Sequence, residues 1–127
     1  MQKFRNAWRA LGWLGIAIIV YLSLVPSPPE PVHFENADKL EHALAYGLVM
    51  LWFCQLYTQR KRLVTGVLLV AMGIAMEFLQ RMTDYRSFEY ADMLADGTGV
   101  LLAWGLAHTP LGRVYYQLEI YLNRQLN

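Results

Sequence analysis

The sequence predicts an all-α membrane protein with four transmembrane helices followed by a C-terminal amphipathic helix. Of its 127 residues, 56% are hydrophobic and only 17% are charged. Each of four apolar segments, at about 8–25, 38–58, 62–81 and 91–108, approaches the roughly 20 residues that a helix needs to cross a bilayer. The length fits one domain, so we expect residues 1–127 to form a single transmembrane unit.

The first apolar segment follows a basic start, formed by Lys3, Arg5 and Arg9, and in this respect resembles a secretory signal. No clear small-residue cleavage site follows it. Four prolines within residues 26–31 come next, and they end the helix and favour an extended loop. We therefore expect a retained first transmembrane helix.

The second and third segments are expected to form an antiparallel hairpin. Asn36 or Asp38 can cap the second helix, because both residue types accept hydrogen bonds from the first helical turn. A basic turn at residues 59–62 joins the two helices, and a loop at 82–90 leads from the third helix to the fourth.

A shorter helix is predicted after the fourth segment, at about 110–126. Thr109 followed by Pro110 is typical of a helix N-cap with proline in the first turn. Apolar residues then recur at helical spacing, with polar residues on the other face. This pattern predicts an amphipathic helix lying on the membrane surface, and docking onto another protein is the alternative.

The distribution of charge predicts the orientation in the membrane. Eight of the eleven basic residues lie in the two terminal tails and in residues 60–62. The positive-inside rule therefore places both termini in the cytoplasm. The net charge of +1 gives no reason to expect a nucleic-acid partner, and the single cysteine, Cys54, excludes an intramolecular disulfide.

Polar residues gather at the other ends of the predicted helices. They are Asp38, Lys39, His42, Tyr46, Glu77, Gln80, Arg86, Asp92 and Asp96. Spacings of three or four residues place the members from one helix on one face. Charged groups inside a membrane usually face the bundle interior, so we expect one polar pocket open to the outer side. A purely structural salt-bridge network is the alternative.

The order and spacing of these residues resemble the VanZ-like family of small bacterial membrane proteins. The matching motifs are Asp38-Lys39-x-x-His42-x-x-x-Tyr46, Glu77-x-x-Gln80, Arg86 and Asp92-x-x-x-Asp96-Gly97-x-Gly99. The resemblance covers about residues 20–107 and implies a multi-pass protein of the bacterial inner membrane, with a link to glycopeptide antibiotic tolerance. Asp96 is a departure, because the family usually has asparagine there, so its role is not carried over.

Three classes of function fit the pocket. We favour a binding protein that takes an envelope lipid headgroup, such as a cell-wall lipid intermediate, or a partner protein, and that needs no cofactor. The alternative is a membrane-embedded hydrolase or transferase acting on a phospho-lipid, in which His42 and the carboxylates could hold a divalent metal. The sequence assigns no catalytic residue and contains no H-E-x-x-H motif. A transporter is the least favoured, because the ionisable residues lie on one side only.

Small residues form a stripe on the fourth segment. Ala95, Gly99 and Ala103 recur every four residues and would allow another helix to approach closely. The stripe predicts either packing within the chain or association of two copies.

Overall fold

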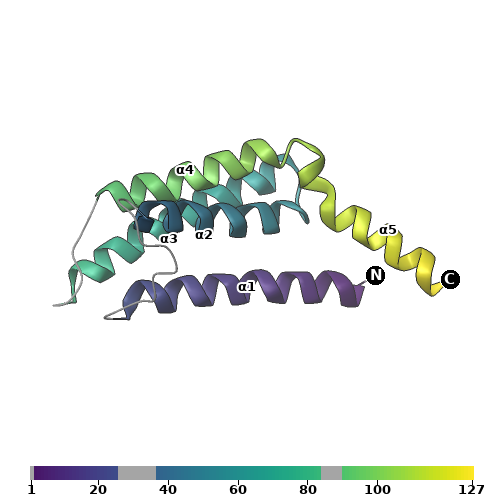
Figure 1. Ribbon diagram of the computed structural model, residues 1–127, viewed down its shortest axis with the longest axis horizontal. Helices are drawn as coiled ribbons and strands as arrows, with labels where there is room; N and C mark the ends of the chain where they lie inside the picture. Colours follow the sequence, from purple (N-terminus) through teal and green to yellow (C-terminus); the bar gives the residue numbers. More distant parts are fainter. Residues whose placement is uncertain (1, 26–36, 84–89) are drawn as a thin grey trace.

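The computed structural model describes residues 2–25, 37–83 and 90–127. All secondary structure in these residues is helical, which confirms the all-α prediction. The helices are α1 (Gln2–Leu24), α2 (Ala37–Cys54), α3 (Gln59–Arg81), α4 (Tyr90–Leu106), the 3-10 helix η1 (Pro110–Arg113) and α5 (Val114–Leu126) (Figure 1). The predicted proline-rich loop and Arg86 lie outside the described residues.

Helices α2, α3 and α4 form a bundle, and α1 runs alongside it (Figure 1). The most extensive packing is between α2 and α4, which cross in close contact. Both termini lie at one end of the bundle, from which α5 projects away. At the other end, α1 and α3 finish and α2 and α4 begin.

The apolar core is centred on α2. Met50, Phe53 and Cys54 of α2 are buried against Leu69 of α3 and Val100 of α4. Cys54 is fully buried as a free thiol, so it serves here as a small apolar residue.

Glycine makes the close crossing of α2 and α4 possible. A Cβ atom on Gly99 would overlap the main-chain carbonyl of Ala43, and one on Gly47 would lie 3.0 Å from the Gly99 oxygen. Gly99 and Ala103 are thus buried within the chain, against α2 and the core. Association of two copies through this stripe stays a prediction.

Arg62 ties together two helix ends at the terminal end of the bundle. Its Nε donates hydrogen bonds to the carbonyls of Cys54 (3.0 Å) and Tyr57 (2.8 Å), and its Nη1 donates to Ala107 (3.0 Å). The guanidinium therefore supplies donors to carbonyls at and just beyond the ends of α2 and α4, with the charge that a helix C-terminus favours. Helix α2 ends at Cys54, four residues before the predicted end at about residue 58, and the Leu56 and Tyr57 amides bond three residues back in turns instead.

Aromatic contacts join α1 to the rest of the terminal end. The indoles of Trp8 and Trp52 stack with ring centroids 3.8 Å apart, and each Nε1 donates to the other residue's carbonyl. Tyr115 of α5 stacks on Phe4 at 5.0 Å and meets Trp8 edge-on. Helix α1 begins at Gln2, six residues before the predicted start at about residue 8, and Phe4 in this added part packs on Tyr115.

The start of the C-terminal region agrees with the sequence. The Thr109 hydroxyl accepts a hydrogen bond from the Leu111 amide at 3.2 Å, and Pro110 opens η1, so the predicted cap is confirmed. The first turn is a 3-10 helix, and α5 then continues to Leu126.

Among the described residues, only α1 and α3 are long and apolar enough to cross a membrane, not all four predicted helices. The 18 residues of α2 include Asp38, Lys39 and Glu41, and α4 has only 17 residues. The apolar segments looked longer in the sequence because apolar residues continue into the turns that follow α2 and α4.

A candidate polar site at the end of the bundle opposite the termini

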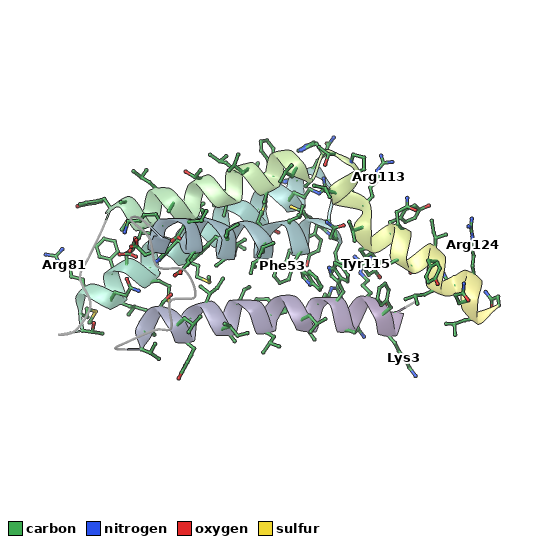
Figure 2. All side chains as sticks on the ribbon, in the orientation of Figure 1. Lys3, Phe53, Arg81, Arg113, Tyr115 and Arg124 are labelled. Atoms are coloured by element: carbon green, nitrogen blue, oxygen red, sulfur yellow. The ribbon has the colours of Figure 1, made fainter. Side chains whose placement is uncertain are left out.

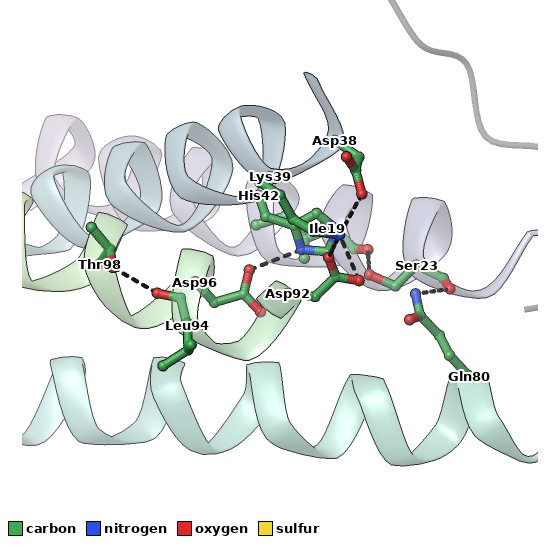
Figure 3. Close-up of polar contacts among 10 residues, drawn as sticks. All are labelled: Ile19, Ser23, Asp38, Lys39, His42, Gln80, Asp92, Leu94, Asp96 and Thr98. Atoms are coloured by element: carbon green, nitrogen blue, oxygen red, sulfur yellow. Dashed lines mark hydrogen bonds and ion pairs between the residues drawn. The ribbon is translucent and has the colours of Figure 1, made fainter. Parts of the chain in front are cut away.

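Seven of the nine predicted site residues lie at the end of the bundle opposite the termini. This set, called the polar cluster below, consists of Asp38, Lys39 and His42 of α2, Glu77 and Gln80 of α3, and Asp92 and Asp96 of α4. Figure 3 draws all of these residues except Glu77. Of the other two, Arg86 lies outside the described residues, and Tyr46 is only 2% exposed and belongs to the apolar core.

Lys39 links the beginnings of α2 and α4. Its Nζ lies 2.6 Å from Asp38 Oδ2 and 2.5 Å from Asp92 Oδ1. Asp38 is at the exposed rim, whereas Asp92 is buried, so the contact with Asp92 is the less screened of the two. The ammonium thus occupies one oxygen of Asp92 and leaves the other facing the interior of the cluster.

His42 lies between the two aspartates of α4. Its Nδ1 is 2.9 Å from Asp96 Oδ1, and its Nε2 is 3.9 Å from Asp92 Oδ2 (Figure 3). An ionised carboxylate can only accept hydrogen bonds, so Nδ1 is the donor whenever Asp96 is charged. In the neutral ring the lone pair then sits on Nε2, which faces Asp92.

Helix α3 closes the cluster from its third side. Glu77 and Gln80 are each only 1% exposed. The Gln80 amide donates to the Ser23 carbonyl at 2.6 Å and so connects the cluster to the end of α1 (Figure 3). Glu77 lies near His42 and Asp92. Each of these three residues offers one possible ligand atom, and the three atoms lie within 4.8 Å of one another.

Two features of the site were missed in the sequence. A Cβ atom on Gly73 would stand 2.7 Å from Asp96 Oδ2, so this glycine makes room for the buried carboxylate. Its spacing from Gly66, one heptad earlier on α3, was the available signal. The contact of Gln80 with the Ser23 carbonyl had no signal in the sequence, because every residue has a main-chain carbonyl.

The polar cluster can hold positive charge. Within the described part of the chain it contains four carboxylates, one ammonium group and one imidazole, brought together from α2, α3 and α4. The predicted gathering of these residues from three helices is therefore present at one end of the bundle. Carboxylate oxygens and a neutral imidazole are also ligand types that divalent metals accept.

Comparison with known proteins identifies one relative of uncharacterized function. An uncharacterized protein of the fission yeast Schizosaccharomyces pombe, C11E3.10, is 28% identical over 92 residues, which cover 69% of this chain and 54% of the yeast protein. The chain thus spans about half the length of the curated relative that it matches. No family model and no solved structure matches the chain. The resemblance to the VanZ-like family stays a prediction.

Proposed function

We propose that this chain is an integral membrane protein with four spanning helices, and that its polar cluster is an outward-facing site for a lipid headgroup. One observation carries the proposal: buried ionisable residues of α3 and α4 meet half-buried ones of α2 at one end of a bundle whose outer surface carries many exposed apolar side chains. The relative comes from a yeast and its name assigns no activity, so the proposal concerns a membrane and not a bacterial cell wall.

The outward faces of all four long helices support a lipid environment. Large apolar side chains that are exposed on them include Leu11, Leu14 and Ile18 on α1, Leu44 and Leu48 on α2, Leu63, Val67 and Leu68 on α3, and Leu101 and Leu102 on α4. In a water-soluble bundle these faces would be polar. Apolar patches that continue over neighbouring helices are unusual on soluble monomers, whereas lipid tails cover them at no cost.

The lengths of α2 and α4 support a position of the polar cluster near a membrane surface. Their 18 and 17 residues rise about 27 and 26 Å, slightly less than the roughly 30 Å hydrocarbon core. A short span is accommodated by local thinning of the bilayer or by polar groups that reach the interface. The cluster lies at the beginning of both helices, so headgroups would approach it there.

The basic residues support an orientation with the polar cluster outside. Lys3, Arg113 and Arg124 lie at the terminal end, and Arg81 lies at the cluster end (Figure 2). Together with the basic turn that begins α3, the terminal end carries most of the positive charge. By the positive-inside rule this end faces the cytoplasm.

The charge of the polar cluster restricts its ligand. Its described carboxylates, on Asp38, Glu77, Asp92 and Asp96, outnumber the single ammonium of Lys39. These described members of the cluster favour a positive group over a bare phosphate. A headgroup would therefore enter with an ammonium group, or with a metal ion bound to its phosphate.

Lipid retention during purification tests this proposal. We expect wild-type protein in mild detergent to keep about one phospholipid per chain through extensive washing, as measured by mass spectrometry. His42→Ala and Asp92→Asn should lose that lipid. His108→Ala is the matched control, because His108 lies at the terminal end, where its ring contacts Trp104. Equal retention by all four proteins, or none by the wild type, would rule out a headgroup site at the polar cluster.

A further inference from the structure

Three donor atoms in the polar cluster lie close enough together to approach one metal ion. His42, Glu77 and Asp92 each offer one atom, and these atoms lie within 4.8 Å of one another. Metal bonds to nitrogen and oxygen are about 2.0–2.2 Å, so two ligands of one tetrahedral ion are about 3.3–3.6 Å apart. His42 Nε2 and Asp92 Oδ2, at 3.9 Å, are slightly wider than this. The widest pair needs to close by up to about 1.5 Å.

The gap between His42 and Asp92 is not a hydrogen bond. A bond of this kind would be about 2.7–3.2 Å long, well short of the 3.9 Å observed. The Nε2 atom of His42 makes no hydrogen bond to any described residue, and the Asp92 oxygen that Lys39 contacts is Oδ1, not Oδ2. The two atoms therefore face each other across a space that suits a bridging cation.

Asp96 orients the imidazole for such a role. A metal-bound histidine almost always donates its second ring N–H to a carboxylate, carbonyl or water, which fixes the tautomer and makes the ligand more basic. The contact of His42 Nδ1 with Asp96, a residue only 2% exposed, has this form. Gly73 keeps the space that the Asp96 carboxylate occupies.

We infer that His42, Glu77 and Asp92 are ligands of a divalent metal ion, with Asp96 as the residue that positions His42. One imidazole and two carboxylates suit zinc, manganese or ferrous iron. Three protein ligands leave a coordination position open for water or for a phosphate oxygen. The inference goes beyond the proposed function, since it stands on donor geometry and needs neither four spans nor a headgroup.

Zinc binding to the purified full chain tests the inference. After removal of metals with a chelator, titration of Zn²⁺ against a chromophoric competitor should show one tight site per chain. We expect Asp96→Asn to weaken binding about 10–100-fold, and His42→Ala, Glu77→Gln and Asp92→Asn to weaken it further. His108→Ala and Glu119→Gln, which change the same residue types outside the cluster, should bind as the wild type does.

Thermal unfolding followed by circular dichroism separates metal binding from folding. The wild type should melt at a higher temperature with zinc than with chelator, and Asp96→Asn should keep part of this shift because its three ligands are intact. If the ligand variants do not fold, the wild type and Asp96→Asn still decide the question. No tight site in the wild type, or an equal loss in His108→Ala, would overturn the inference.

The two proposals can fail separately. Lipid retention by a chain without a tight zinc site would contradict the metal site and leave the headgroup site standing. A tight zinc site in a chain that retains no lipid would contradict the headgroup site and leave the metal site standing.

Discussion

The two ends of the bundle use buried and half-buried charge in different ways. At the terminal end, Arg62 donates to three main-chain carbonyls, which complete the ends of α2 and α4. At the cluster end, Lys39 and His42 contact carboxylate side chains of α4. Helix ends need capping in any fold. At the cluster end, charge is used instead to join side chains of different helices.

Between these ends, the crossing of α2 and α4 should be the most sensitive part of the molecule. In Gly99→Ala, the new methyl group would overlap the Ala43 carbonyl, so the helices must separate. We expect a loss of about 3 kcal/mol or more in the free energy of unfolding, at the upper end of overpacking costs. Gly105→Ala is the control, because nothing lies within 4 Å of its new Cβ. It should be neutral or stabilising by up to about 1 kcal/mol. Thermal melting of both variants in detergent measures the difference, and equal melting points would refute the close crossing.

The next largest effect should come from Arg62. Arg62→Gln cannot reach all three carbonyls, and loss of charged hydrogen bonds should lower the free energy of unfolding by about 2 kcal/mol. Lys61→Gln changes the neighbouring exposed charge and should cost at most about 0.5 kcal/mol.

A second measurement on Arg62→Gln sharpens the comparison of the two ends. Zinc binding and lipid retention should be unchanged in the folded protein, because the polar cluster lies at the opposite end. Loss of either one without unfolding would show that Arg62 also serves the site.

The smallest effect should be local to α5. Tyr115→Ala removes the stacking on Phe4 and the edge contact with Trp8, and it should cost about 1 kcal/mol of docking free energy. Tyr116→Ala, an exposed neighbour, is the matched control. Limited proteolysis should cut the C-terminal segment faster in Tyr115→Ala only. If both variants are cut as slowly as the wild type, α5 is held by contacts other than the Tyr115 stack, such as contacts with the membrane surface.

The sequence predicted the helices and the membership of the polar cluster because both depend on local patterns. Apolar runs showed the helices, and Thr109 with Pro110 marked the start of the last region. The spacing of His42, Glu77 and Asp96 near the ends of three helices was enough to predict that they meet.

Other features depend on three-dimensional contacts that no local pattern encodes. In the sequence, Arg62 contributes only to the charge pattern that predicts the membrane orientation. Its hydrogen bond to the Ala107 carbonyl joins residues 45 positions apart. Tyr46 follows His42 at helical spacing, but one turn carries it into the core. The stripe at Gly99 predicted a close contact without telling whether the partner was another copy or α2.

Accessibility of single cysteines from outside the cell tests the membrane orientation most directly. In a Cys54→Ala background, Met82→Cys reports on the cluster end, and Arg60→Cys and Leu126→Cys report on the terminal end; all three positions are exposed. A membrane-impermeant maleimide is added to intact cells, with any outer membrane permeabilised. We expect labelling of Met82→Cys alone, and labelling of the other two only after the membrane is disrupted. Labelling of Arg60→Cys and Leu126→Cys in intact cells, with Met82→Cys protected, would contradict an outward-facing polar cluster.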